Sequence, residues 1–280
     1  MLWRGRQGSG NVEDRRGIGG PVAVGGGIIG VIALLFNLLT GSNVDPSQIQ
    51  LPNGGGSSRQ MSAEQKARQD TLAEFSKVVL KETENVWQEI LPQQANKNYQ
   101  DPTLVLFSDA VQSACGNASS ATGPFYCPGD NKLYVDLSFF DELGQRFGAA
   151  GDFAMAYVIA HEVGHHVQTL LGTSDKMARV RQQVGEAEYN KYSVMMELQA
   201  DFLAGVWAHY IKGKGILEAG DIEEALTAAN AIGDDRLTQG RVSPDNFTHG
   251  TSAQRMYWFK KGYQTGDVRQ GNTFDDPSLQ

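Results

Sequence analysis

The sequence predicts an α+β domain that is mostly helical and carries a small sheet. Apolar residues recur at helical spacing over several long segments, whereas few segments have the pattern of strands. Residues 103–111 form one such strand segment, and a second begins residues 132–143 with β-branched and aromatic residues after the turn signal PGDN. A chain of 280 residues is long enough for one domain with a substantial core.

The helical pattern has recognisable start and stop signals. Ser62 can cap the first helix, and Pro92 is expected to end it. Asp152 is expected to cap the second helix, and Gly172 lies at its end. These two helices and three further ones are expected at residues 62–91, 152–172, 186–213, 217–232 and 251–264.

The first 61 residues are expected to lie outside this domain. Residues 22–39 form an apolar run without any charge, just long enough to cross a bilayer as a helix. A Gly/Ser/Pro/Gln-rich stretch with little to pack follows it. The predicted order is a cytoplasmic segment, one transmembrane anchor, a flexible linker and the α+β domain, at residues 1–20, 21–40, 41–61 and 62–280.

Two other interpretations of the apolar run are open. A buried core helix is disfavoured by the glycine-rich flanks on both sides, and a cleaved signal peptide by a late start and the lack of an A-x-A site. For an anchor, the arginines that precede the run place the N-terminus in the cytoplasm. We therefore expect a single-pass protein of the bacterial inner membrane with a periplasmic or otherwise extracytoplasmic domain.

The two cysteines agree with an oxidising compartment. Cys115 and Cys127 enclose a loop rich in Gly, Pro and Ser, and a disulfide is the expected pairing there. Two free buried thiols are the alternative. The net charge of −8 argues against a nucleic-acid partner, which would require a basic surface.

The sequence AHEVGHHVQTLLG at residues 160–172 suggests a metal site on a helix. His161 and His165 are four residues apart and therefore project from one helical face, where both imidazoles can reach one zinc ion. Glu162 can serve as the general base beside the metal. The alternative is a solvated polar face, which the apolar residues around the motif disfavour.

A third ligand is needed, and residues 195–205 offer candidates. Glu197 and Asp201 are four residues apart in an otherwise apolar helical segment, where acids are costly unless they are paired or bind metal. A zinc-binding Glu197 and an Asp201 that accepts a hydrogen bond from a ligand imidazole would satisfy both. An ordinary ion pair or a solvated stripe is the alternative.

HEVGH followed by ELQAD resembles the gluzincin pattern of zinc peptidases. Over nearly its whole length the chain is similar to the bacterial putative neutral zinc metallopeptidase family, through NVEDRRG, CPGDNKLYVDLSFFDEL, AYVIAHEVGHHVQ, ELQADFLAGVWAH and HGTSAQRMYWFKKGYQTGD. The resemblance implies a zincin-like fold and one zinc ion per chain on His161, His165 and Glu197. It also implies Glu162 as the base and Asp201 as the residue that orients His161.

The resemblance also implies a substrate strand, because a strand before the active-site helix of zincins pairs with the peptide. Here that strand would be Lys132, Leu133, Tyr134, Val135, Asp136 and Leu137. The residue that stabilises the oxyanion is expected to be His249, with His209 and Tyr210 as alternatives. His166 points away from His165 around the helix and is expected beside the site or on the surface.

These expectations combine into a membrane-anchored zinc metallopeptidase, an endopeptidase that cleaves peptides or proteins with a metal-bound water and Glu162 as general base. The alternative is an inactive relative that still binds metal and acts as an envelope scaffold or holds a partner. The presence of Glu162 favours the enzyme, since a scaffold does not need it. The sequence gives no oligomeric state.

Overall fold

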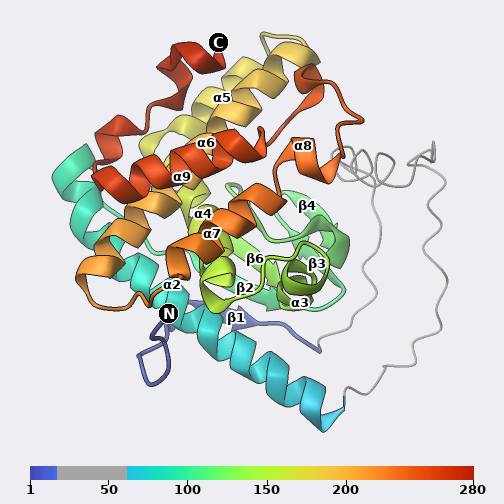
Figure 1. Cartoon of the computed structure of the whole chain (residues 1–280), viewed down its shortest axis with the longest axis vertical. Helices are drawn as coiled ribbons and strands as arrows, with labels where there is room; N and C mark the ends of the chain where they lie inside the picture. Colours follow the sequence, from blue (N-terminus) through green and yellow to red (C-terminus); the bar gives the residue numbers. More distant parts are fainter. Residues whose placement is uncertain (18–61) are drawn as a thin grey trace.

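The computed structural model describes residues 1–17 and 62–280, which form an α+β fold (Figure 1). The helices gather on one face of a four-stranded sheet, and a two-stranded hairpin packs on the other face. The side chains of the sheet alternate accordingly: Leu104 and Leu133 join the helical core, whereas Val105 and Tyr134 join a smaller cluster under the hairpin. The prediction of a mostly helical domain with a small sheet is confirmed for these residues.

The four-stranded sheet has the order β1-β2-β6-β5. β1 (Val12–Asp14), β2 (Thr103–Phe107) and β6 (Lys132–Asp136) are parallel neighbours, and β5 (Phe125–Cys127) pairs with β6 in the antiparallel direction. β6 is therefore an interior strand, and β1 and β5 are the edges.

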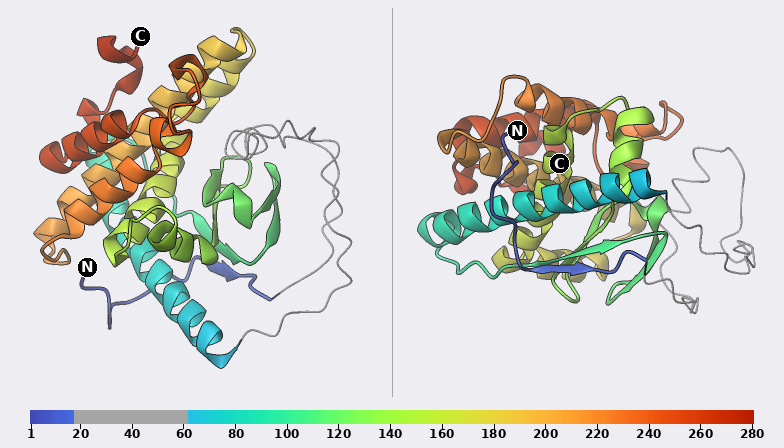
Figure 2. Two further views of the ribbon diagram at one scale, coloured as in Figure 1. Left: turned by 45° about the vertical axis from the view of Figure 1, so that its right-hand side comes forward. Right: turned by 90° about the horizontal axis from the view of Figure 1, so that it is seen from below.

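The N-terminal residues belong to this domain, which corrects the prediction that the domain begins at residue 62. β1 pairs with β2 in the register Val12 to Leu104, and Met1 and Trp3 are buried in the helical core. Figure 2 shows these residues running beside α2 into the sheet. This packing is incompatible with residues 1–17 in the cytoplasm and the rest of the domain outside it.

The long helix α2 (Ala63–Ala95) starts as the sequence predicts. Ser62 accepts a hydrogen bond from the backbone of Gln65, whose side chain in return accepts from the Ser62 backbone, so the pair forms a capping box. The expected end at Pro92 is wrong, because the helix continues to Ala95 and stops at Asn96 in a left-handed conformation. Pro92 is accommodated in the last turn of the helix.

The first predicted strand segment, residues 103–111, is shorter than expected, whereas residues 132–143 begin with a strand as predicted. β2 ends at Phe107, because Asp109 adopts a positive φ of 65° and the chain turns into the hairpin of β3 (Ala110–Ser113) and β4 (Gly116–Ser119). β6 ends at Asp136, and the short helix α3 (Ser138–Gln145) follows. Cys115 and Cys127 form a disulfide that ties the hairpin to β5, so the expected pairing is confirmed.

The remaining helices surround α4, which packs against α6, α7, α2 and β5. Gly151, rather than the predicted Asp152, is the N-cap of α4, and Gly172 ends the helix in a left-handed conformation as expected. The predicted helix at 217–232 begins later, after Gly220. These helices are α4 (Asp152–Leu171), α5 (Thr173–Arg181), α6 (Glu186–Gly213), α7 (Asp221–Ala231), α8 (Asp234–Leu237) and α9 (Ser252–Thr265).

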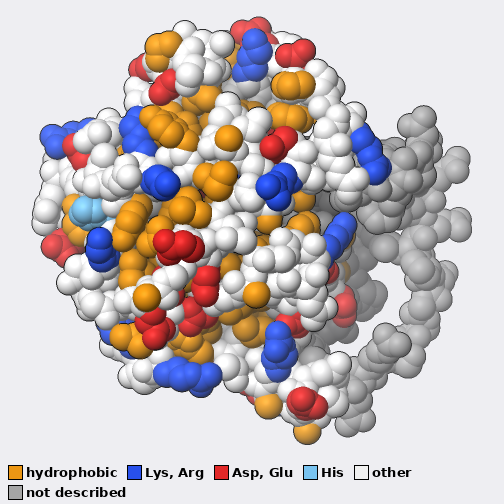
Figure 3. Space-filling view, in the orientation of Figure 1, with side chains coloured by type: hydrophobic (Ala, Val, Ile, Leu, Met, Phe, Trp, Pro, Cys, Tyr) orange, Lys and Arg blue, Asp and Glu red, His pale blue; other side chains and the backbone are white. Residues whose placement is uncertain are grey.

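The predicted anchor at 21–40 and linker at 41–61 lie outside the described residues. Among the helices of residues 1–17 and 62–280, none combines the length and apolar character that a bilayer crossing requires. On the face shown in Figure 3, lysine and arginine side chains are scattered among apolar, acidic and uncharged residues.

Candidate metal centre

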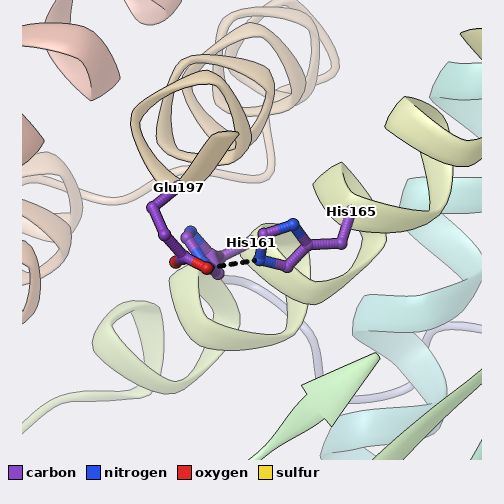
Figure 4. A group of neighbouring side chains, drawn as sticks. All are labelled: His161, His165 and Glu197. Carbon is purple, nitrogen blue, oxygen red and sulfur yellow. Dashed lines mark hydrogen bonds and ion pairs between the residues drawn. The ribbon is translucent and has the colours of Figure 1, made fainter. Parts of the chain in front are cut away.

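Two neighbouring helices bring the predicted ligands together. His161 and His165 lie on successive turns of α4, and Glu197 faces them from α6 (Figure 4). Nε2 of His161 is 3.1 Å from Oε2 of Glu197, and Nε2 of His165 is 3.4 Å from Oε1 of the same carboxylate. Donor atoms bound to a tetrahedral zinc at bonds of ~2.1 Å are about 3.4 Å apart, so this donor set fits the ion.

The close approach of α4 and α6 depends on a glycine within the motif. A Cβ atom placed on Gly164 would lie 2.9 Å from the carbonyl oxygen of Ala200 and 3.1 Å from its Cα. Any larger residue would push the two helices apart. Gly164 therefore allows Glu197, one turn before Asp201, to reach the histidines.

A chain of buried polar contacts holds His161. Its Nδ1 donates a hydrogen bond to Oδ1 of Asp201 at 2.8 Å, which leaves Nε2 directed at Glu197. Asp201 is fully buried and also accepts hydrogen bonds from the Tyr157 hydroxyl and from the Arg255 guanidinium, at 2.9 Å from Nε and 3.1 Å from Nη2. Asp201 is thus placed as expected, beside His161.

Arg255 and Tyr157 were not singled out from the sequence as site residues. Arg255 is 2% exposed, although it lies in the first turn of α9, and its partner is remote in the chain. The signal in the sequence is its position one turn before the buried Trp258 and Phe259, on the apolar face of α9. A charged residue on such a face requires a buried partner.

The electrostatic environment of the site favours a cation. Burial alone would lower the pKa of His161, but Asp201 and Glu197 outweigh burial and raise the pKa to about 10. Burial would raise the pKa of Glu197, but the two histidines hold it well below its usual value. Acidic groups that stabilise positive charge so strongly on the imidazoles can equally stabilise a metal ion, which competes with protons for the same nitrogen atoms.

Glu162 lies beside this donor set without belonging to it. It follows His161 on α4 and is 7% exposed. Burial raises the pKa of its carboxyl group, against the opposing effect of the neighbouring histidines. A carboxylate with a raised pKa takes up a proton more readily, which suits a general base that must also return the proton.

The three candidates for stabilising the oxyanion, His249, His209 and Tyr210, lie at different distances from the candidate metal centre. His249 precedes α9. Burial would lower the pKa of His249, but a hydrogen bond to Asp234 raises it, and the carboxylate of Glu197 is close enough to raise it further. His209 and Tyr210 lie three turns after Glu197 on α6 and contact the Tyr263 carbonyl and Gln94 instead.

His166 is buried, which excludes the surface, one of the two positions expected for it. Its two ring nitrogens contact the Tyr126 hydroxyl at 3.1 Å and the Gln100 carbonyl at 2.6 Å. The bond to Tyr126 connects α4 to β5, the edge strand that contains Tyr126, and the bond to Gln100 connects α4 to the segment before β2.

The predicted substrate strand at residues 132–137 requires a correction. Lys132–Asp136 pairs with β2 along its whole length, and its first three residues also pair with β5, so its backbone is not free to bind a peptide. Leu137 lies outside the strand as the N-cap of α3. The edge strand beside α4 is β5, a three-residue strand that the sequence pattern did not reveal.

A second group of acids lies at the first turn of α4, ahead of the histidines, and includes two residues of α7. Asp152, Asp221 and Glu224 are close enough to share a cation, and the N-terminal amine of Met1 pairs with the first two. Three carboxylates without an imidazole or thiolate are not the donors that zinc prefers. The group with His161, His165 and Glu197 is the better zinc site.

Comparisons with known proteins agree with this assignment. The family model described as "Putative neutral zinc metallopeptidase" matches residues 1–274. The uncharacterized protein YpfJ of Escherichia coli K12 is 48% identical over 286 residues, which cover 98% of this chain and 99% of YpfJ. The uncharacterized protein Rv2575 of Mycobacterium tuberculosis H37Rv is 45% identical over 208 residues, which cover 69% of this chain and 68% of Rv2575. No solved structure matches.

Proposed function

Because the chain belongs to the putative neutral zinc metallopeptidase family, we propose that it hydrolyses peptide bonds at the centre formed by His161, His165 and Glu197. The observation that carries the proposal is the donor geometry, in which two imidazole nitrogens and one carboxylate converge at the spacing of zinc ligands beside the buried Glu162. One zinc ion per chain would occupy this centre.

The metal ligands, Glu162 and His249 have different roles in the proposed reaction. Zinc, when bound, would act as a Lewis acid on the scissile carbonyl and would make a water molecule a stronger nucleophile. Glu162 takes the proton from the attacking water and passes it to the leaving amine. His249 donates a hydrogen bond to the oxygen that becomes negatively charged, which is supported by its raised pKa and its proximity to Glu197.

A substrate would lie in extended form along the free side of β5. This edge strand runs beside α4 and is joined to it through the contact between Tyr126 and His166. A strand edge offers backbone hydrogen-bonding groups to a peptide of any sequence. The chain is expected to cleave unfolded proteins such as casein better than folded ones.

The first test of this proposal is the zinc content of the full-length chain, compared with that of His161→Ala. We expect about one zinc per chain in the parent and loss of the ion in the variant, because two protein ligands hold zinc poorly. Mass spectrometry under native conditions or elemental analysis measures this. A folded parent that takes up no zinc would contradict the proposal. Zinc without any hydrolysis would favour the inactive scaffold.

We also propose that the domain acts on the extracytoplasmic side of the bacterial inner membrane. The disulfide between Cys115 and Cys127 supports this location, because such bonds persist in oxidising compartments. In cells whose outer barrier has been made permeable, a membrane-impermeant maleimide is expected to label Gln182→Cys, an exposed position. Labelling that requires lysis of the inner membrane would place the domain in the cytoplasm instead.

A further inference from the structure

Gln168 is a buried amide on α4, three residues after His165, and it contacts both helices of the metal centre. Its side chain is fully buried. Its Oε1 lies 2.8 Å from Nδ1 of His165, and its Nε2 lies 2.7 Å from the backbone carbonyl of Met196 and 3.1 Å from Oε1 of Gln199. None of these contacts was anticipated from the sequence.

The contact with Met196 determines the orientation of the amide. A backbone carbonyl can only accept a hydrogen bond, so the nitrogen end of Gln168 must face Met196 and the oxygen end must face His165. An amide oxygen likewise can only accept, and Nδ1 of His165 must therefore carry a proton. The lone pair needed for metal binding is then on Nε2, the nitrogen that faces Glu197.

The same amide joins the helix that carries the histidines to the helix that carries the third ligand. Met196 directly precedes Glu197 on α6, and its carbonyl accepts from Gln168 on α4. His161 has a corresponding acceptor in Asp201, but that acceptor is charged and is paired with Arg255. His165 receives a neutral acceptor, so its orientation is fixed without adding negative charge to the site.

From these contacts we propose that Gln168 is a positioning residue, which fixes the ring orientation and tautomer of His165 and holds the Glu197 turn of α6 against α4. This role rests on one part of the proposed function, the binding of zinc at this centre. It does not require hydrolysis. Hydrogen bonds of this kind to a ligand histidine affect metal affinity by about 10–100-fold.

The test compares the zinc affinity of the full chain with that of Gln168→Met, measured by competition with a chelator. Methionine has a similar length but accepts no strong hydrogen bond, and we expect about 10–100-fold weaker binding. Gln168→Glu restores an acceptor for Nδ1 but loses the donor to the Met196 carbonyl, so it is expected to recover only part of the affinity. Thr169→Val is the matched control, since Thr169 bonds to the backbone carbonyl of His165 and not to its ring; its affinity should equal that of the parent.

Nuclear magnetic resonance provides a second measurement that does not depend on the stability of the variant. In the zinc-loaded parent, the Nδ1 proton of His165 should exchange slowly with water because it is bonded to a buried amide oxygen. A proton that exchanges as fast as that of an exposed histidine would overturn the proposal, as would a Gln168→Met chain with the parent's affinity. If the parent binds zinc but cleaves no substrate, only the proposed hydrolysis fails.

Discussion

Glu162→Gln is expected to abolish most hydrolysis while leaving one zinc per chain. Glutamine has nearly the same shape as glutamate but cannot take a proton from water at neutral pH, so the loss is on the order of 10²–10⁴-fold in kcat. Zinc binding should persist because Glu162 is not one of the three donors that converge in the site. Cleavage of quenched fluorescent casein and elemental analysis of the same sample give both values.

Two further variants are compared with Glu162→Gln, one as a control and one as a test of His249. Glu142→Gln makes the same chemical change at an exposed glutamate of α3 and should leave activity unchanged. His249→Ala should lower kcat by about 10²–10³-fold with zinc retained, if His249 stabilises the oxyanion. Parent-like cleavage by Glu162→Gln would refute the role of Glu162 as base, whatever the outcome for His249.

Arg255→Met is expected to cause the largest loss of stability. Arg255 and Asp201 are 2% and 0% exposed, and removal of the guanidinium leaves a buried carboxylate without its main countercharge. Breaking a buried pair in this way costs about 3–5 kcal/mol in the free energy of unfolding. Urea unfolding with EDTA present measures the effect without a contribution from the metal.

Arg269→Met supplies the comparison for this second result. Arg269 also forms an ion pair with an aspartate, Asp267, but its side chain is 74% exposed. An exposed pair of this kind contributes little, because water screens the charges in both states. If the two arginine variants unfolded at the same urea concentration, Arg255 would not be the group that stabilises the buried carboxylate of Asp201.

The sequence predicted which residues form the candidate metal centre better than it predicted the surroundings of that centre. HEVGH and ELQAD are local patterns on helices whose ends are marked by nearby residues, such as Gly172 for α4. The spacing of four then determines which side chains share a face. For α6 the predicted and observed bounds coincide at Glu186–Gly213.

Neither the sheet nor the buried residues that hydrogen-bond to the candidate ligands and to Asp201 could be predicted in this way. β1 and β5 have three residues each, too few for a recognisable period, and their place in the sheet depends on partners distant in the chain. The interior position of β6 follows from its pairing with β2 on one side and β5 on the other. Arg255 likewise acquires its role only when α9 packs on α6, and Gln168 only when α6 packs beside α4.

The parallel pairing of β1 with β2 has a consequence for the compartment in which the chain can fold. β1 is synthesised well before β2, so the outer position in the sheet stays vacant until both pieces of the domain are present in one aqueous compartment. Export that left the N-terminus behind would deprive the sheet of its outermost strand.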